Sequence, residues 1–390
     1  MAVGRYSPHL IAFLLCTSAA AASPLPASSA AAMPTSATAA AIDRVAGEAI
    51  KERVAAGAVV GVADGDTLFV RGYGFADLEN RVPVTERTVF RIGSVTKQFT
   101  TAALLLLQER GKLSLDDTLD RYFPTFPRGG EVTLRQLATH SSGIHNYTAD
   151  GFFREAARQD RPTDAMVDYI ARQEKPFDFE PGTAWNYSNS GYVLLGAVIE
   201  KVAGVPYSVF LDQNILGPLA LKDTAVDDLA EIVPGRAHGY EADKEAPAGF
   251  VNTSFLSMSA AAAAGAMRST PADMLAWHRA LFGGKLLKPE SLAAMTEPAR
   301  LKDGRLTSAG RLPGRQATPP SDYALGLTVA REEGRRMIGH GGSINGFNAT
   351  LHTYPDEGVT IVLLTNTSGA AYATAPALAK AYFQARALPR

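Results

Sequence analysis

The sequence predicts an α+β fold in which both ends of the chain form one antiparallel sheet, flanked by helices. Two short apolar segments, 58–62 and 67–73, are joined by Asp64-Gly65-Asp66, a turn typical of hairpins. Helical patterns fill the middle, so we expect a large, mainly helical insertion over roughly 100–280 beside the sheet. Four more strand patterns follow, separated by Gly-containing turns at 333–334, 341–342 and 355–358: 323–331, 336–340, 347–354 and 359–366.

The first 40 residues differ from the rest of the chain. Arg5, the apolar stretch 10–16 and the small residues 20–22 form the pattern of a secretory signal peptide, which we expect over 1–22. Residues 23–40 are almost all Ala, Ser, Pro and Thr, a composition that predicts a disordered tether. The apolar stretch is too short to span a bilayer. We therefore expect a periplasmic or secreted protein with no transmembrane segment in the mature chain.

Cysteine usage agrees with this expectation. Cys16 is the only cysteine and lies inside the expected signal peptide, so the mature chain would have neither disulfides nor a catalytic thiol. Lipid attachment at Cys16 is the alternative, but the bulky residues 13–15 before it disfavour that modification.

Residues 41–390 are expected to form one domain. Its first helix is predicted over 42–55, where Ile42, Val45, Ala46 and Ala49 lie on one face. The later helical patterns are 94–109, 113–123, 132–140, 163–173, 193–202, 207–215, 271–282 and 374–385, and 260–264 is a run of alanines. The segments 229–258 and 302–320 are expected to be irregular.

Composition and charge limit the classes of partner. The chain has 390 residues, of which 46% are hydrophobic and 20% charged, and its net charge of -1 gives no electrostatic basis for binding nucleic acid. We expect no nucleic-acid partner and no cofactor. His140 and His145 could be metal ligands, but no third ligand clusters with them in the sequence, so we expect no metal site.

The strongest chemical signal is Ser94-Val95-Thr96-Lys97 at the start of the first long helix. Side chains three residues apart share one helix face, so an amine and a hydroxyl can meet there. A serine is a weak nucleophile until a base takes its proton, and a lysine is such a base when burial lowers its pKa. Backbone N–H groups at the helix start can bind an oxyanion. The alternative is an ordinary helix start, since Ser is a common N-cap.

Two further motifs could complete a site. Tyr187-Ser188-Asn189 precedes an apolar helix, and a buried phenol near a lysine can ionise and shuttle a proton, while an amide can hold the lysine and a substrate carbonyl. The alternative is an aromatic core residue followed by an N-cap. His340-Gly341-Gly342-Ser343 lies between two strand patterns, where Gly lets a ligand or backbone approach. The alternative there is a tight turn with a solvated histidine.

Together these motifs, each present once and in this order, resemble the serine β-lactamase and penicillin-binding-protein superfamily. The resemblance is greatest to its class C-like branch of esterases, D-aminopeptidases and D-alanyl-D-alanine carboxypeptidases. It covers roughly 42–385 and includes further matching segments at 137–143, 179–192 and 339–342.

The resemblance implies a β-lactamase/transpeptidase-like fold and a role for each motif residue. Ser94 is the expected nucleophile of an acyl-enzyme, and Lys97 and Tyr187 activate it and protonate the leaving group. For substrate binding, Asn189 orients Lys97 and the substrate, His340 and Gly342 line the far wall, and Ser343 shares the oxyanion site with Ser94 through its N–H group. Glu180 is a rival base that more simply supports a turn.

The resemblance leaves the substrate open. Many members carry Lys-Thr-Gly where this chain has His340-Gly341-Gly342, and a mostly neutral histidine suits a β-lactam carboxylate less well than a lysine. We therefore expect hydrolysis of a small ester or a D-amino-acid peptide. A β-lactamase proper, or a nonenzymatic sensor that binds peptidoglycan fragments or β-lactams, is the alternative.

Overall fold

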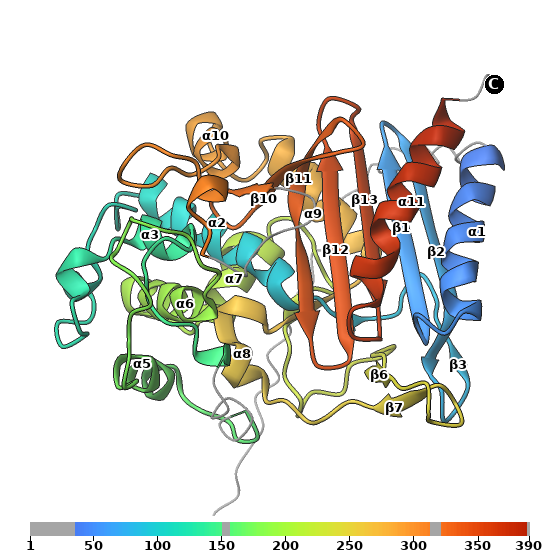
Figure 1. The fold of residues 1–390 in the computed structure, drawn as a ribbon, viewed down its shortest axis with the longest axis horizontal. Helices are drawn as coiled ribbons and strands as arrows, with labels where there is room; N and C mark the ends of the chain where they lie inside the picture. The colour runs from blue at the N-terminus through green and yellow to red at the C-terminus, as the bar shows by residue number, and fades with distance from the viewer. Residues whose placement is uncertain (1–35, 150–156, 313–320, 388–390) are drawn as a thin grey trace, which may run out of the picture. The chain divides into compact units, whose positions relative to one another are not determined.

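The computed structural model describes residues 36–149, 157–312 and 321–387. The expected signal peptide and most of the expected tether lie outside these residues. The main feature is an eight-stranded antiparallel sheet with the order β3-β2-β1-β13-β12-β11-β10-β9 (Figure 1). Its strands are β1 (Gly57–Asp64), β2 (Thr67–Asp77), β3 (Val82–Pro83), β9 (Ser321–Tyr323), β10 (Thr328–Glu332), β11 (Arg335–Ile344), β12 (Phe347–Tyr354) and β13 (Val359–Thr365).

The pairing of β1 with β13 joins the two ends of the chain, as the sequence predicts. The register places Val60 opposite Leu363 and Val62 opposite Ile361. These four side chains belong to one hydrophobic cluster, and Val59, Val362 and Leu364 belong to another. Because side chains alternate across a strand, the central strands are buried on both faces, which explains why β1 is almost continuously apolar.

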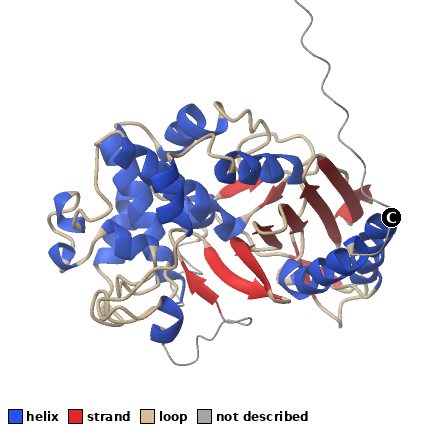
Figure 2. Cartoon of the chain, turned by 90° about the horizontal axis from the view of Figure 1, so that it is seen from above, coloured by secondary structure: helices blue, strands red, loops and turns tan. Residues whose placement is uncertain are grey.

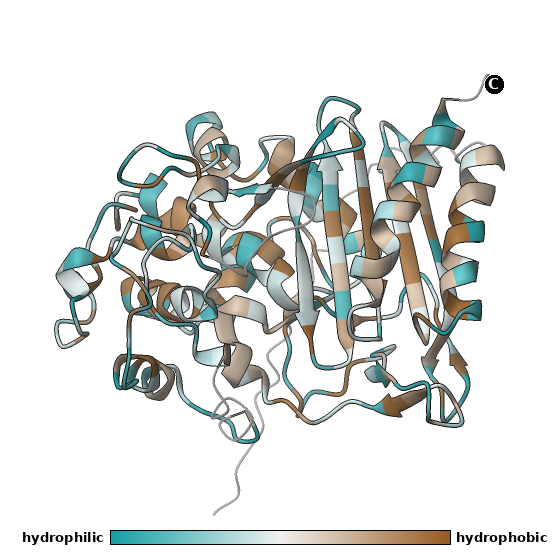
Figure 3. Cartoon of the chain, viewed as in Figure 1, coloured by the Kyte–Doolittle hydropathy of each residue, from teal (hydrophilic) through white to brown (hydrophobic). Residues whose placement is uncertain are grey.

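Helices cover the two faces of this sheet. α1 (Ser36–Lys51) and α11 (Ala370–Arg386) pack together on one face, where Ile42 and Leu378 are fully buried (Figures 1 and 2). α9 (Pro271–Phe282) packs against β1 and β13 on the other face. The hydropathy colouring of α1 shows apolar residues along one stripe, consistent with its burial on one side only (Figure 3).

The helical region beside the sheet is centred on α2 (Thr96–Glu109), in which every residue from Thr96 to Leu107 is buried. α6 (Asn189–Ala203) and α8 (Met258–Gly265) pack against it. The remaining helices are α3 (Leu134–Ala138), α5 (Thr163–Ala171), α7 (Tyr207–Leu211) and α10 (Pro289–Thr296). A small sheet, β4-β8-β5, comprises β4 (Phe90–Arg91), β8 (Met267–Ser269) and β5 (Ala225–Val226).

Local sequence signals fix several helix ends. Thr133 and Gln136 form a reciprocal capping box at α3, as their spacing predicts. Thr270 accepts a hydrogen bond from the N–H of Asp273 at the start of α9, one residue before Pro271. Gly204 ends α6 in the left-handed conformation with a φ of 71°.

Several predictions about the elements are wrong. The segment 113–123 is not an α-helix and contains only the 3-10 turn η2 (Leu119–Arg121), and the strand expected over 323–331 is divided into β9 and β10. α1 begins at Ser36, so residues 36–40 are helical rather than part of a disordered tether. A short hairpin, β6 (Tyr240–Ala242) and β7 (Phe250–Asn252), interrupts the segment expected to be irregular. α10 is not predicted at all. Residues 341–342 do not separate two strands, because β11 continues through them to Ile344.

Among the described residues, no single helix has the length and apolar character needed to cross a membrane; α6 passes that test only together with Tyr207–Leu216, across a 74° bend.

Candidate active site

Ser94 lies in a short 3-10 turn, η1 (Gly93–Val95), that leads directly into α2. Lys97 follows one turn later, and its Nζ is 3.0 Å from the Oγ of Ser94. The spacing of the motif therefore brings the two side chains together, as predicted. Lys97 is fully buried, whereas Ser94 keeps partial access to solvent.

Two further acceptors surround the amine of Lys97. Nζ lies 2.8 Å from Oδ1 of Asn189, the first residue of α6, and 2.7 Å from the backbone carbonyl of Ala264 in α8. Burial lowers the pKa of Lys97 well below its usual value of 10.5. Sequence reasoning did not identify Ala264, because any residue type can supply a backbone carbonyl.

Tyr187 also reaches Ser94 and Lys97. Nζ of Lys97 is 4.8 Å from the centre of the Tyr187 ring. Burial raises the pKa of Tyr187 well above 10, although a hydrogen bond with Ser94 opposes that shift. The sequence suggested a phenol that ionises, but these surroundings favour the neutral phenol in the resting site.

His140 lies directly behind Tyr187. Its ring centre is 4.2 Å from that of Tyr187, and its Nδ1 accepts a hydrogen bond of 3.2 Å from the backbone N–H of Ser188. His140 is 1% exposed and has a positive φ of 60°, which is strained for a histidine. It therefore contacts the segment that carries both Tyr187 and Asn189. The sequence suggested His140 only as a weak metal ligand.

His145, considered as a metal ligand, and Glu180, considered as a rival base, both have partners other than Ser94. The Nδ1 of His145 is 2.7 Å from a carboxylate oxygen of Asp178, so His145 and His140 have different partners. Glu180 is exposed and pairs with Arg128 at 2.5 Å, which gives no support to Glu180 as a rival base.

One group among the described residues has the composition of a small cation site. Asp77, Glu79 and His238 each bring a ligand atom within 4.8 Å of the others. Asp77 already accepts hydrogen bonds from Asn80, and Glu79 accepts one from the hydroxyl of Tyr240. This group therefore has a structural explanation without an ion.

Strand β11 is in contact with the turn that holds Ser94. A Cβ built on Gly342 would lie 1.9 Å from the carbonyl of Ile92 and 2.9 Å from the N atom of Ser94. A Cβ on Gly93, whose φ is +50°, would lie 2.8 Å from the N atom of Ser343. Glycine is required at both positions by this close approach. The backbone N atoms of Ser94 and Ser343 are thereby placed at one edge of the site.

Ser94, Asn189 and Ser343 open onto a cavity of about 160 Å³. Its other lining residues are apolar or carry hydroxyl and amide groups: Tyr147, Thr148, Leu256, Ala261, Ala264, Gly265, Ile344 and Asn345. Asn189 spans the wall, because its Nδ2 donates to Oγ1 of Thr148 while its Oδ1 faces Lys97.

His340 is placed differently from the expectation that it lines this cavity. Its side chain is 5% exposed, with Nε2 2.8 Å from the hydroxyl of Tyr323 and Nδ1 2.5 Å from the carbonyl of Gly341. Burial, followed by the nearby Lys97, lowers the pKa of His340 to about 3. The ring is therefore neutral at pH 7 and bonded within the protein.

Comparison with known proteins places these observations in a family. The β-lactamase family model matches residues 42–383. The chain is 28% identical to penicillin-binding protein 4* of Bacillus subtilis (strain 168), over 80% of this chain and 68% of that protein. It is 27% identical to a D-aminopeptidase of Gluconobacter oxydans (strain 621H), over 83% of this chain but only 58% of that protein. A shorter match, 36% identical over 47% of this chain and 50% of that protein, is esterase EstB of Burkholderia gladioli.

Solved structures support the same placement. The crystal structure of D-amino acid amidase from Ochrobactrum anthropi SV3 with L-phenylalanine amide superimposes with a TM-score of 0.77. It covers 90% of this chain and 99% of that chain at 27% identity. Because the family model spans the sheet, the helical region and all three motifs, the chain belongs to the β-lactamase family and is a serine hydrolase of that family.

Proposed function

We propose that this hydrolase cleaves esters or amides by acyl transfer through Ser94. The Oγ of Ser94 attacks the substrate carbonyl carbon, the alcohol or amine leaves, and water then hydrolyses the acyl-enzyme. The observation that carries this proposal is the set of three contacts around Nζ of Lys97: Ser94, Asn189 and Ala264.

These contacts suit a neutral amine that can act as a base, as well as an ammonium. A neutral amine has two N–H donors and one lone pair, whereas an ammonium has three donors and no acceptor. Asn189 Oδ1 and the Ala264 carbonyl are obligate acceptors, and they use both N–H groups. The lone pair then faces Ser94, whose hydroxyl can donate its proton. The lowered pKa of Lys97 favours this neutral form over an ammonium, which would donate to all three acceptors.

Tyr187 is proposed to transfer the proton onward to the leaving group. Its hydroxyl stays protonated at rest, so it can donate a proton as the leaving group departs and recover one from Ser94 or Lys97. The backbone N–H groups of Ser94 and Ser343 are proposed to stabilise the oxyanion.

The site supports a small acyl group that carries no carboxylate. The cavity of about 160 Å³ is lined by hydroxyl, amide and apolar groups, and the neutral His340 supplies no cation for a carboxylate. We therefore favour a small ester or a D-amino-acid amide or peptide, in keeping with relatives named as an esterase and a D-aminopeptidase. A second candidate function is a β-lactamase, or a sensor that binds β-lactams or peptidoglycan fragments. It is supported by a relative named as a penicillin-binding protein.

One set of measurements tests this proposal. Purified protein and its Ser94→Ala variant are assayed with p-nitrophenyl acetate, D-phenylalanine amide and a chromogenic cephalosporin. We expect turnover of the first or second substrate, none with the variant, and a phosphonate adduct on the peptide that holds Ser94. A stoichiometric burst without turnover would favour the sensor, and an adduct on another peptide would exclude Ser94 as the nucleophile.

We also propose that the chain is exported and cleaved near Ser23. The support is the signal-peptide pattern over 1–22. N-terminal sequencing of protein from the periplasm or medium is expected to begin near Ser23. Recovery of the chain with Met1 intact in a soluble cytoplasmic fraction would contradict export.

A further inference from the structure

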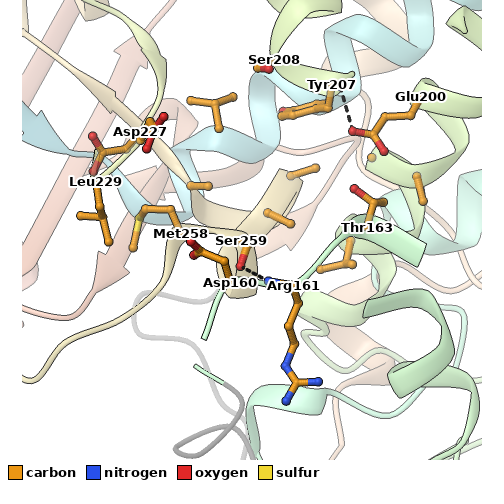
Figure 4. Close-up of a pocket in the computed structure, with 18 of the residues that line it drawn as sticks. Asp160, Arg161, Thr163, Glu200, Tyr207, Ser208, Asp227, Leu229, Met258 and Ser259 are labelled. Carbon is orange, nitrogen blue, oxygen red and sulfur yellow. Dashed lines mark hydrogen bonds between the residues drawn. The ribbon is translucent and has the colours of Figure 1, made fainter. Parts of the chain in front are cut away.

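A second cavity, of about 340 Å³, lies between α6, α8, the start of α7 and the loop that follows β5 (Figure 4). Its size lies within the range of small-molecule sites, and it is about twice as large as the catalytic cavity. Its base is apolar, formed by buried side chains that include Val193, Ala197 and Met258.

Four of the polar residues that line this cavity carry carboxylates, beside hydroxyl side chains and the guanidinium of Arg161. Glu200 uses Oε1 to accept a hydrogen bond from the N–H of Tyr207, and Asp160 and Asp228 lie at the exposed rim. Asp227 is already neutralised by ion pairs with Arg91, Arg236 and Arg268. The guanidinium of Arg161 extends away from the other labelled side chains in Figure 4. An apolar base with carboxylates around it is complementary to a small cation that carries an apolar group.

Helix α8 separates this cavity from the catalytic one. Ala262 and Ala263 line the second cavity, whereas Ala261, Ala264 and Gly265 line the catalytic cavity. The carbonyl of Ala264 accepts a hydrogen bond from Lys97, and the carbonyl of the preceding residue, Ala263, accepts one from Thr100. The Oγ1 of Thr100 lies 2.7 Å from the hydroxyl of Tyr207, another residue of the second cavity.

The dividing wall contains a strained residue. Ala262 has φ 42° and ψ -141°, far from helical values, in the middle of α8. Such a conformation costs on the order of 1–3 kcal/mol for a residue with a Cβ. It occurs where one residue separates the two cavities, so a ligand that contacts Ala262 acts on the backbone that positions the Ala264 carbonyl.

We propose that the second cavity is a regulatory site for a small amphipathic ammonium ion, with its apolar group over Val193 and Met258 and its charge near Glu200. Occupancy of the site shifts α8 and thereby changes the hydrogen bond between Ala264 and Lys97. A ligand can change catalysis in this way only to the extent that it binds two arrangements of α8 unequally. The regulatory part rests on Lys97 being the catalytic base, whereas the binding part does not.

Binding is tested by calorimetric titration of the full chain with benzylammonium chloride, and with benzyl alcohol as the uncharged probe. Glu200→Gln removes the charge but keeps an acceptor for the N–H of Tyr207, and Asp228→Asn is a second variant at the rim. Asp164→Asn is the matched control, because it removes a charge one residue from Thr163 but does not line the cavity.

We expect Glu200→Gln to weaken benzylammonium binding by about two- to fivefold, the scale of a partly exposed ion pair. Asp228→Asn should weaken benzylammonium binding less, and Asp164→Asn should not weaken it. Benzyl alcohol should bind to wild type and to Glu200→Gln with equal affinity. Equal affinity of wild type, Glu200→Gln and Asp228→Asn for benzylammonium would overturn the site, whatever substrate the enzyme hydrolyses.

Regulation is tested by ester hydrolysis at saturating benzylammonium. We expect a change in kcat that substrate does not reverse, and its loss in Glu200→Gln. Competitive inhibition would place the probe in the catalytic cavity and overturn the proposal. Saturable, Glu200-dependent binding with no change in kcat would overturn the coupling through α8, and absence of any hydrolysis would instead contradict the proposed function.

Discussion

Replacing Asn189 by Asp tests whether Lys97 works as a neutral base. The change places a carboxylate at the position of Oδ1, 2.8 Å from Nζ, with almost no change in shape. An acidic residue is also favourable in the first turn of α6, so the fold should be retained. The new negative charge stabilises the ammonium form of Lys97 and raises its pKa.

The size of the shift follows from Coulomb's law. Two unit charges 2.8 Å apart interact by about 6 kcal/mol at an effective dielectric constant of about 20, which equals about four pKa units. The cost of desolvating the new carboxylate reduces this value, so we expect a rise of about two to four units. A base with a raised pKa is active only at higher pH, so the acidic limb of kcat/KM moves upward by the same amount.

The assay is the pH dependence of kcat/KM for an uncharged nitrophenyl ester. At pH 7 the variant should lose about tenfold in rate for each unit by which the new pKa exceeds 7, and the rate should recover as the pH rises. Asn189→Ala is the control, because it removes the acceptor without adding charge and should lower the rate without moving the limb upward. An unchanged acidic limb in Asn189→Asp would show that Lys97 is not the titrating base.

The remaining predictions concern the walls of the site and the buried histidines. Gly342→Ala should lower kcat by about 10²–10³ with a smaller effect on KM, because the new Cβ displaces the turn that carries the Ser94 N–H group; a kcat near that of wild type would contradict this oxyanion site. His140→Asn should keep more activity than His140→Ala, because an amide oxygen can still accept the Ser188 N–H and Asn tolerates a positive φ, and equal losses in kcat would remove that explanation. The pH profile of neutral-ester hydrolysis should show no limb from His340, whose pKa is about 3, and a limb in wild type that disappears in His340→Gln would refute this. Thermal stability should fall as pH drops from about 6.5 towards 3. Burial lowers the pKa of His278 and His340 to about 3 and that of His352 to about 4, so the unfolded chain binds more protons than the folded chain over that range. A Tm that stays constant below pH 6 would be inconsistent with these buried neutral rings.

Periodicity and turn chemistry are local signals, which is why they predict most of the elements. The β1–β13 pairing could be anticipated because the strand patterns recognised in the sequence lie near the two ends of the expected domain. α10 was missed because it is short, and β6 and β7 because each has only three residues. Residues 341–342 were misread as a turn because glycine occurs both in turns and where another part of the chain approaches a strand closely. Here Gly342 permits the contact of β11 with η1, and Gly341 permits its contact with the ring of Tyr372.

The motif residues that sequence reasoning identified are those whose side chains carry the chemistry. Ser94, Lys97, Tyr187 and Asn189 converge as expected, since their spacing and order carry that information. The position of His340 was not predictable, because burial and a hydrogen bond with Tyr323 depend on the packing of β9 against the rest of the sheet. Ala264 acts through its carbonyl, and no residue type marks that role.

Backbone strain connects the fold to the site. Of the non-glycine residues with positive φ in the described ranges, five lie in or beside turns at the surface: Arg53, Arg81, Arg128, Ala220 and Glu333. Of the other two, His140 packs against Tyr187, and Ala262 lies two residues before Ala264 in α8. Strain of this kind persists only where surrounding contacts over-determine the backbone. The Tyr187 ring and the Ala264 carbonyl therefore each lie next to a strained residue. A change that relaxes the strain at Ala262 should stabilise the fold while it loosens the Ala264 carbonyl, which accepts the hydrogen bond from Lys97.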